Sequence, residues 1–313
     1  MRNQMVQQIP PTLSGVFAAL PTPYGVDGSP AIEALYPILD FLLGKRLPGL
    51  CIGGVTGEYA ACSVEERTLL FRTVARRVDG RANLILGVGG EHSGHVLRLA
   101  RAGADCGAVA VLLPPPSFLR FDAGDLMNFL QQVGSELPLP VLLYNIPQFT
   151  RELGMQNILR LIRSVPNIVG VKDSSGLLLN LSLIREAKAT TPMVFFIGSD
   201  ELLLEAFEHG ANGAISGTAS ACPELILGVY EAFRSGKKEK ARALQILVEE
   251  FLTRIRVFPP PWAIKLALQA RGIQTGSLGW PMGKRLCLKG EEFQEWFSGW
   301  IAACELASAR AAQ

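Results

Sequence analysis

The stretch from Val141 to Lys172 reads VLLYNIPQFTRELGMQNILRLIRSVPNIVGVK, and it contains one complete strand–helix–strand unit. Short apolar runs at Val141–Tyr144 and Ile168–Lys172 have the length and composition of strands that are buried on both faces. Between them, Met155–Ser164 has the 3.6-residue period of an amphipathic helix. Two strands joined through a helix lie parallel in one sheet, so this stretch predicts an α/β fold.

The same alternation of strand and helix recurs on both sides of this unit. Its spacing is roughly 20 to 35 residues, the length of a strand plus a crossover helix. The other predicted strands are Val16–Leu20, Gly49–Ile52, Leu84–Val88, Ala108–Leu112, Val194–Ile197 and Gly213–Ser216. The other predicted helices are Ile32–Leu43, Gly94–Ala102, Gly124–Glu136, Leu178–Ala189, Glu201–His209 and one that begins after Ser63. Eight such units favour a closed (β/α)8 TIM barrel over an open doubly wound sheet.

The helix after Ser63 has the clearest start signal in the chain. Ser63-Val64-Glu65-Glu66 matches a capping box. In this motif the serine hydroxyl accepts a hydrogen bond from the backbone N–H of the second glutamate, and the side chain of that glutamate accepts one from the backbone N–H of the serine. The buried stripe of this helix is expected to consist of Leu69, Leu70, Thr73, Val74 and Val78.

Beyond Cys222 the strand pattern stops and only helical patterns follow. They are Pro223–Ser235, Lys237–Val257, Pro261–Ala270 and Glu291–Ala307. The 313 residues suffice for one barrel-sized core with an extension. We therefore expect a barrel with an N-terminal tail in residues 1–222 and a C-terminal helical domain in residues 223–313.

Composition points to a globular protein without nucleic-acid or membrane partners. Apolar residues make up 49% and charged residues 19%, and 30 basic against 28 acidic residues give a net charge of +2. No run reaches the roughly 18 apolar residues of a membrane span, and Met1–Leu13 does not have the pattern of a signal peptide. The six cysteines are spread singly and without C-x-x-C spacing, which indicates reduced thiols in the cytoplasm.

In an eight-stranded βα barrel the active site lies at the carboxyl ends of the strands. The predicted strand from Ile168 is apolar until it ends in Lys172. An amine held against an apolar wall loses hydration when it is charged, which favours the neutral, nucleophilic form. The structural alternative is a lysine that extends to the barrel rim or pairs with Asp173. This strand alone leaves both interpretations open.

Two further segments are candidates for the same site. The preceding predicted strand ends in Tyr144, whose phenol is placed either to transfer protons or simply to pack with a hydrogen-bonded hydroxyl. Just past the second predicted strand lies the glycine-rich turn Gly53-Gly54-Val55-Thr56-Gly57-Glu58. Its free backbone N–H groups and the Thr56 hydroxyl suit a carboxylate, although glycine-rich turns are common.

Taken together, these segments resemble the dihydrodipicolinate synthase and N-acetylneuraminate lyase family over most of the chain. The resemblance is carried by Gly53–Glu58, Tyr144–Pro147, Val169–Gly176, Gly198–Asp200 and Gly210–Ser216, in an order and at separations that agree with the family. It implies that Lys172 forms a Schiff base, that Tyr144 transfers protons, and that Thr56 with its adjacent backbone binds a carboxylate. With it we expect further substrate contacts from Val55, Gly57, Phe149 and Ile215, and a homotetramer.

The sequence departs from the synthase branch of the family in three places. Val55 stands where that branch usually has a second hydroxyl residue, and Pro114-Pro115-Pro116 replaces a tyrosine pair, so two hydroxyl groups of a proton relay are missing. Phe149 stands where the synthase has the arginine that binds the carboxylate of its second substrate. Arg151 lies two residues further on and is a candidate replacement, with a different geometry.

We therefore interpret the chain as a Schiff-base-forming lyase or aldolase. Through Lys172 it is expected to act on pyruvate or a longer 2-oxo acid by aldol cleavage, condensation or dehydration. The protonated imine is itself the electron sink, so neither a metal ion nor an organic cofactor is expected. The alternatives are an authentic 4-hydroxy-tetrahydrodipicolinate synthase, which the three departures disfavour, and a catalytically silent 2-oxo-acid-binding barrel, which retention of Lys172 and Tyr144 disfavours.

Weaker signals are interpreted structurally. His92 and His95 are expected to be surface or capping residues rather than metal ligands. Glu58 is expected to anchor the glycine-rich turn by accepting hydrogen bonds from N–H groups. The four tryptophans, Trp262, Trp280, Trp296 and Trp300, are expected to pack the C-terminal helices.

Overall fold

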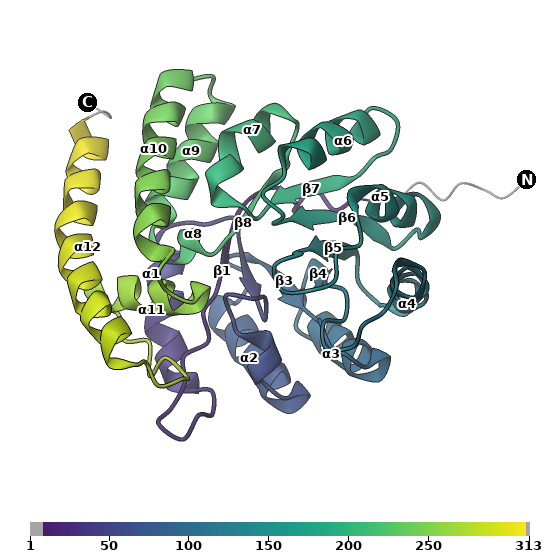
Figure 1. The fold of residues 1–313 in the computed structure, drawn as a ribbon, viewed down its shortest axis with the longest axis horizontal. Helices are drawn as coiled ribbons and strands as arrows, with labels where there is room; N and C mark the ends of the chain where they lie inside the picture. Colours follow the sequence, from purple (N-terminus) through teal and green to yellow (C-terminus); the bar gives the residue numbers. More distant parts are fainter. Residues whose placement is uncertain (1–8, 311–313) are drawn as a thin grey trace, which may run out of the picture.

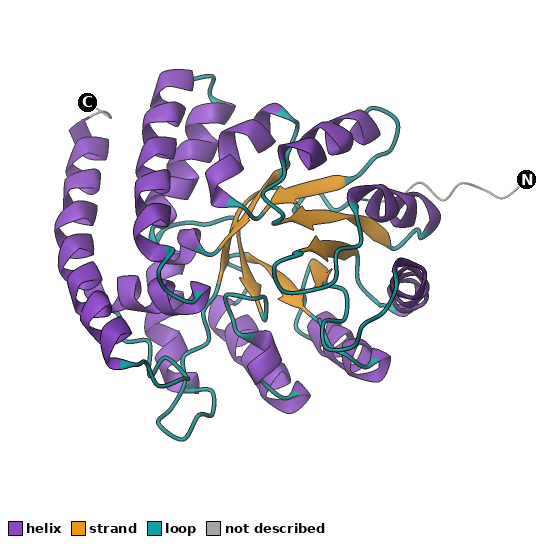
Figure 2. Cartoon of the chain, in the orientation of Figure 1, coloured by secondary structure: helices purple, strands orange, loops and turns teal. Residues whose placement is uncertain are grey.

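The computed structural model describes residues 9–310 and has eight parallel strands that form a closed barrel (Figures 1 and 2). Each strand pairs with its neighbours in sequence, and β1 pairs with β8 to close the sheet. The strands are β1 (Gly15–Ala19), β2 (Gly49–Ile52), β3 (Asn83–Gly87), β4 (Ala110–Leu113), β5 (Val141–Asn145), β6 (Ile168–Asp173), β7 (Val194–Ile197) and β8 (Gly213–Ser216). The predicted (β/α)8 barrel is confirmed, and each predicted strand overlaps an observed one.

Helices cover the outside of the barrel between successive strands (Figure 1). They are α1 (Leu35–Gly44), α2 (Val64–Val78), α3 (Ser93–Asp105), α4 (Ala123–Glu136), α5 (Met155–Ser164), α6 (Leu178–Lys188) and α7 (Leu203–Glu208). Short 3-10 helices, Ile32–Ala34 and Asp200–Leu202, precede α1 and α7, and another, Tyr59–Ala61, follows the glycine-rich turn. After β8 come α8 (Thr218–Ala221), α9 (Pro223–Arg234), α10 (Lys238–Ile255), α11 (Pro260–Ala270) and α12 (Lys284–Arg310).

The start of α2 has the predicted capping box. The Ser63 hydroxyl accepts a hydrogen bond from the N–H of Glu66 at 3.1 Å, and the Glu66 carboxylate accepts one from the N–H of Ser63 at 2.7 Å. The predicted buried stripe is wrong at Leu69, whose side chain is 47% exposed while Leu70 is buried. Leu69 lies one position away from the face of α2 that meets the barrel, so its side chain leaves the interface.

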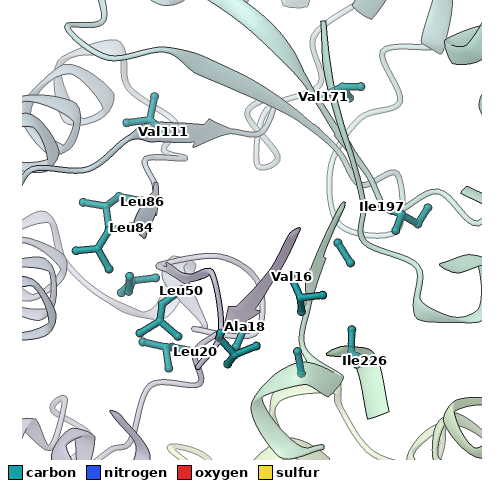
Figure 3. Close-up of a cluster of buried hydrophobic side chains, with 14 of the residues drawn as sticks. Val16, Ala18, Leu20, Leu50, Leu84, Leu86, Val111, Val171, Ile197 and Ile226 are labelled. Atoms are coloured by element: carbon teal, nitrogen blue, oxygen red, sulfur yellow. The ribbon is translucent and has the colours of Figure 1, made fainter. Parts of the chain in front are cut away.

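Two sets of buried side chains fill the fold. Outward-facing strand residues such as Val16, Ala18 and Val171 pack under the helices, as Figure 3 shows. Ile226 of α9 lies close to Val16 and Ala18 in this cluster (Figure 3). The inward-facing residues form a separate cluster inside the barrel, and its members include Phe17, Cys51, Leu112, Leu142, Tyr144, Phe196 and Ile215. Strand side chains thus alternate between the two clusters, as a closed parallel barrel requires.

The C-terminal helices α9–α12 gather on one side of the barrel (Figure 1). Helix α10 is tied to the barrel by Gln245, whose side-chain amide donates to the carbonyl of Asp200 at 3.1 Å. Helix α12 packs on α10 and on the segment after it through an aromatic cluster of Phe251, Phe258, Phe293, Trp296, Phe297 and Trp300. The domain boundary after residue 222 stays a prediction.

The structure differs from the sequence-based expectations at two places in the C-terminal region. Helix α12 begins at Lys284 rather than at Glu291, because Gly290 lies inside the helix and does not end it. Trp262 is buried, whereas Trp280 is 62% exposed, contrary to the expectation that it packs the C-terminal helices.

The six cysteines form no disulfide bond with one another within residues 9–310. In the same residues no helix is long and apolar enough to cross a membrane.

Candidate active site

The register between β5 and β6 places Lys172 directly beside Tyr144 inside the barrel. Val141 pairs with Ile168, whereas the next residue, Leu142, pairs with Gly170, so the register shifts by one residue. Val169 is the extra residue. After the shift, Tyr144 and Lys172 are partners across the two strands, and Tyr144 belongs to the inner cluster.

The Lys172 amine is enclosed by the inner wall of the barrel. Lys172 is 5% and Tyr144 4% exposed, and Nζ donates a hydrogen bond to the tyrosine hydroxyl at 3.1 Å. The same Nζ lies 4.2 Å from the centre of the tyrosine ring. Within the described residues no carboxylate oxygen lies within 4.0 Å of this amine. An enclosed amine beside a tyrosine hydroxyl is placed to attack a carbonyl carbon that enters the barrel.

Asp173, the structural alternative as a partner for Lys172, faces the other side of β6. Its carboxylate accepts hydrogen bonds from the Asn145 side chain at 2.6 Å and from the Ser175 hydroxyl at 3.0 Å. Burial raises the pKa of this carboxyl group, and the hydrogen bonds from Asn145 and Ser175 oppose the rise. Asp173 therefore ties β5 to the loop after β6 and leaves Lys172 to the barrel interior.

Gly198, directly after β7, leaves the space that the lysine side chain fills. A Cβ atom built on Gly198 would lie 2.6 Å from Cε of Lys172 and would also overlap the Ser174 hydroxyl. Any larger residue would force the lysine away from Tyr144. The segment that begins at Gly198 continues into Asp200, whose carboxylate accepts a hydrogen bond from Ser216 Oγ of β8 at 2.8 Å.

The glycine-rich turn after β2 presents unpaired polar groups. The N–H groups of Val55 and Thr56 have no backbone acceptor among the residues described, whereas the Gly57 carbonyl accepts a bond from the Thr22 hydroxyl at 2.7 Å. The Thr56 hydroxyl lies 3.0 Å from the position that a Cβ atom would take on Gly217, which follows β8. Two N–H groups without a backbone acceptor and the Thr56 hydroxyl are donors of the kind that suit a carboxylate.

The remaining predicted substrate contacts lie at two depths. Ile215 of β8 is fully buried in the inner cluster, and Val55 packs against the same cluster. Cys51 of β2 lies there too, and burial raises the pKa of its thiol to about 11, an effect that the Lys172 charge reduces. Phe149, in the loop that leaves β5, is 50% exposed.

A cavity of about 410 Å³ opens beside Phe149 and Val55. Its other lining residues are Glu58, Tyr59, Ala60, Ala61, Ser117, Pro259, Pro260, Pro261 and Trp280. Arg151 does not line it; its Nε donates to the carbonyl of Phe121 at 3.3 Å. Arg151 therefore lies outside the wall that Phe149 helps to form, and its role as a replacement arginine stays a prediction.

Tyr59 is a polar residue of this region that the sequence analysis did not single out. Burial raises the pKa of its phenol, the nearby Arg67 guanidinium lowers it, and charges on Glu91 and Tyr144 raise it further. Arg67 lies 5.2 Å from the ring centre and is itself held by the carbonyls of Gly87 and Gly89. Tyr59 directly follows the glycine-rich turn in sequence, which is the signal that points to it.

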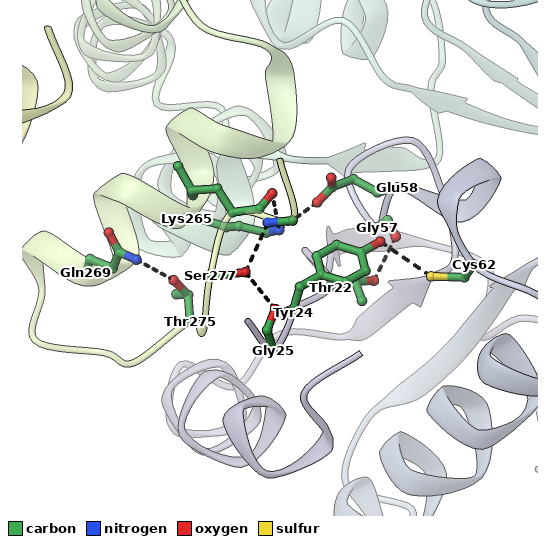
Figure 4. Close-up of polar contacts among 12 residues, drawn as sticks. Thr22, Tyr24, Gly25, Gly57, Glu58, Cys62, Lys265, Gln269, Thr275 and Ser277 are labelled. Carbon is green, nitrogen blue, oxygen red and sulfur yellow. Dashed lines mark hydrogen bonds and ion pairs between the residues drawn. The ribbon is translucent and has the colours of Figure 1, made fainter. Parts of the chain in front are cut away.

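Glu58 has a different partner from the one predicted. Its carboxylate accepts a hydrogen bond from Lys265 Nζ of α11 at 2.6 Å, and the side chains are 8% and 0% exposed (Figure 4). Glu58 has the left-handed backbone conformation with φ 53°, which is rare for a residue other than glycine. The ion pair thus holds the end of the glycine-rich turn in an unfavourable conformation.

A small network surrounds this ion pair. Lys265 Nζ lies 4.6 Å from the centre of the Tyr24 ring, and the Tyr24 hydroxyl is 3.4 Å from Cys62 Sγ (Figure 4). Burial raises the pKa of Glu58 and lowers that of Lys265, and in each case the partner's charge opposes the effect of burial. Desolvation therefore outweighs the attraction within the pair.

The two histidines near α3 have structural roles. His92 Nδ1 accepts a hydrogen bond from the N–H of Gly94 at 3.1 Å and caps α3, as predicted. In residues 9–310 no group of three or more His, Cys, Asp or Glu side chains is placed to hold a metal ion. The sequence-based expectation that no metal or cofactor takes part stays a prediction.

Comparison with known proteins gives a consistent result across the whole chain. Residues 12–294 match the dihydrodipicolinate synthetase family. The chain is 31% identical to 4-hydroxy-tetrahydrodipicolinate synthase of Saccharophagus degradans, over 86% of this chain and 92% of that protein. It is also 31% identical to N-acetylneuraminate lyase of Rhizobium meliloti, over 79% and 83%. The fold matches a prophage protein of the dihydrodipicolinic acid synthase family from Escherichia coli, solved with pyruvate, with a TM-score of 0.85 at 23% identity over 92% and 98%.

The burial of the Glu58–Lys265 pair leads to a prediction about stability. Lys265→Met should lower the free energy of unfolding by about 3–5 kcal/mol, because it leaves a buried carboxylate without its partner. The double variant Glu58→Gln/Lys265→Met should recover most of this loss, since it removes both charges. Urea denaturation at pH 7 measures both, with Arg242→Met, which breaks an exposed ion pair with Glu239, as the control with little effect. Equal losses in the single and double variants would contradict the prediction.

Proposed function

The chain belongs to the dihydrodipicolinate synthetase family, whose members include lyases and aldolases, and we propose that it forms a Schiff base between Lys172 and a 2-oxo acid. The substrate is pyruvate or a longer 2-oxo acid, which the enzyme cleaves, condenses or dehydrates. The observation that carries this proposal is the buried Lys172 amine, 3.1 Å from the Tyr144 hydroxyl and without a carboxylate partner in the described chain.

In the first step the neutral amine of Lys172 attacks the C2 carbonyl carbon of the substrate. The carbinolamine that results must lose its hydroxyl group as water, which requires a proton donor beside the amine. Tyr144 Oη lies at hydrogen-bond distance from Nζ and is the group placed to give that proton. The product is a protonated imine that links substrate C2 to the lysine nitrogen.

The protonated imine then accepts the electron pair of a bond at C3. Loss of a proton from C3 gives an enamine, and cleavage of the C3–C4 bond of a longer acid gives the same enamine and an aldehyde. Tyr144 receives and returns the protons of these steps. Since the imine itself holds the electrons, the proposed reaction uses no metal ion and no organic cofactor.

The substrate carboxylate binds at the glycine-rich turn in this proposal. The N–H groups of Val55 and Thr56 and the Thr56 hydroxyl supply donors, while Gly57 is fixed through its carbonyl by Thr22. Ile215 and Val55 provide the apolar wall next to the methyl or methylene carbon C3. This arrangement leaves C4 and the groups beyond it directed towards the barrel mouth and Phe149.

An authentic 4-hydroxy-tetrahydrodipicolinate synthase is the second candidate, because relatives of that name are 31% identical to this chain. The residues at the mouth disfavour it. Phe149 offers no charged donor to a second carboxylate, and Arg151 is bound to the Phe121 carbonyl instead. A homotetramer and a cytoplasmic location complete the proposal; the first rests on family resemblance and the second on the free cysteines.

Borohydride trapping tests the central claim. Incubation with pyruvate and borohydride should modify Lys172 irreversibly, because reduction of an imine gives a stable secondary amine. Peptide mass mapping locates the adduct, and the Lys172→Met variant, which lacks the amine, is the control. An adduct on another lysine, or none with any 2-oxo acid, would refute the proposal and leave the silent binding barrel.

The role of Tyr144 is tested by removing only its hydroxyl group. Tyr144→Phe should lower kcat by roughly 10²–10⁴-fold, the usual effect of losing an acid–base group, while the substrate still binds. Steady-state kinetics on a 2-oxo acid substrate measure kcat and KM separately. Phe121→Leu, an apolar change in the loop before α4, is a control that should leave kcat unchanged. Parent-like turnover in Tyr144→Phe would assign the proton transfer to another group.

Aspartate semialdehyde distinguishes the two enzyme candidates. We expect little or no condensation of pyruvate with this aldehyde, because its carboxylate meets Phe149 instead of a cation and an unpaired buried charge costs several kcal/mol. A coupled assay with the downstream reductase measures the activity directly. Turnover near ~10 s⁻¹, the median for enzymes, would establish the synthase instead. Phe149→Arg should give a partial gain of this activity.

A further inference from the structure

The cavity of about 410 Å³ beside Phe149 has a mostly apolar wall. Proline, alanine, valine and aromatic side chains form most of its wall. The only charged lining residue in the described chain is Glu58, whose carboxylate is paired with Lys265. Ser117 is the only aliphatic hydroxyl, and Glu91 accepts hydrogen bonds from both its hydroxyl and its N–H at 2.8 Å.

Val55, Tyr59 and Phe149 place this cavity next to the inner cluster that contains Tyr144. Val55 lines the cavity and packs against the inner cluster that contains Tyr144. Tyr59 lines it as well and directly follows the glycine-rich turn. Phe149 stands on the loop that leaves β5, and its N–H donates to the carbonyl of Ile146 at 3.0 Å.

Two large aromatic side chains of the wall remain exposed. Phe149 is 50% and Trp280 62% exposed, although they come from the β5 loop and from the segment between α11 and α12. An aromatic side chain contributes most to binding when both faces of its ring are covered. Here the cavity is lined by both Phe149 and Trp280. An apolar ligand group in the cavity would cover the area that the protein leaves in contact with water.

The adjoining polar surface does not offer a better place for a polar substrate tail. A second hollow shares Tyr59 and Ser117 with the cavity and contains Arg67 and Arg98. Arg67 donates to two backbone carbonyls, and Arg98 is paired with Glu65. Both guanidinium groups are thus engaged by the protein itself.

From this arrangement we infer that the enzyme selects 2-oxo acids whose distal end is apolar and aromatic, and this inference rests on the proposed function. A cavity of about 150 Å³ already holds a benzene molecule, so the volume here suffices for a substituted ring and the carbon chain that joins it to the imine. No lysine or arginine among the described lining residues is available to pair with a second carboxylate, and the wall offers few hydrogen bonds to the hydroxyl groups of a sugar acid. The aromatic end lies between Phe149, Trp280 and the proline run Pro259–Pro261.

The reaction that follows is a reversible aldol step. The enamine formed from pyruvate on Lys172 attacks the carbonyl carbon of an aromatic aldehyde, and one C–C bond forms between pyruvate C3 and that carbon. The aldehyde oxygen takes up a proton and becomes a hydroxyl group. Water then releases a 4-aryl-4-hydroxy-2-oxobutanoate from the lysine, and the reverse sequence gives pyruvate and the aldehyde without any oxidant or reductant.

A comparison of kcat/KM for three aldehydes tests the inference on the full-length enzyme. Pyruvate is supplied with benzaldehyde, glyceraldehyde or aspartate semialdehyde, and its consumption is followed with lactate dehydrogenase. The expected kcat/KM for benzaldehyde exceeds that for either polar aldehyde by at least about tenfold, the effect of burying one aromatic ring. A preference for glyceraldehyde or aspartate semialdehyde would overturn the inference.

Variants of the wall locate the preference. Phe149→Ala and Trp280→Ala should each reduce the ratio of benzaldehyde to glyceraldehyde kcat/KM by about tenfold. Phe118→Ala is the matched control, because Phe118 is 84% exposed, neighbours Ser117 and does not line the cavity. An equal change in the Phe118→Ala ratio would also overturn the inference.

Borohydride trapping with pyruvate alone distinguishes failure of the aromatic specificity from failure of the proposed function. A Lys172 adduct combined with a preference for polar aldehydes removes the aromatic specificity and leaves the proposed function standing. Absence of the adduct removes the proposed function, and the inference falls with it.

Discussion

The one-residue register shift between β5 and β6 is the constraint on which the site depends. Side chains alternate strictly across a strand, so each residue of a barrel strand faces either the interior or the helices. Val169 faces the interior, and uninterrupted alternation from it would turn Val171 inwards and Lys172 out towards the helices. The shift reverses this order beyond Gly170, so Val171 packs under the helices and Lys172 meets Tyr144. A single irregularity of the sheet therefore decides whether the side chain of Lys172 points into the barrel.

The residues around the buried Lys172 amine must be held in fixed positions, and several of them come from segments that are distant in the sequence. Gly198 of the neighbouring strand end provides room for the lysine side chain, and Asp173 binds Asn145 and Ser175 on the opposite side of β6. The glycine-rich turn is held by Lys265 of the C-terminal region through Glu58. A buried ion pair is by itself weak evidence for stability, because both charges lose their hydration. The Glu58–Lys265 pair fixes the conformation of the turn, so the C-terminal helices support the candidate active site.

At the mouth of the barrel, mostly apolar side chains form the wall of the cavity that Phe149 lines. In the proposed reaction the residues around Lys172 bind the part that every 2-oxo acid shares, so they do not distinguish one substrate from another. In the same proposal, discrimination falls to Phe149, Trp280 and the prolines, whose side chains are apolar. An apolar wall discriminates against a second carboxylate strongly, because a desolvated charge without a partner costs more than a lost apolar contact.

The sequence by itself determined the eight strands, most of the helices, the capping box at Ser63, and the likeness of Lys172 and Tyr144 to a catalytic pair. These features are local: a strand, a helix or a cap is specified by residues a few positions apart, and parallel strands bring their carboxyl ends to one face. The tertiary structure alone decided the register at Val169, the pairing of Glu58 with Lys265, the exposure of Trp280 and the place of Tyr59 near Tyr144. Each of these depends on segments far apart in the chain, 207 residues apart for Glu58 and Lys265. No local periodicity specifies such a contact, because it arises only when packed elements bring both residues to the same place.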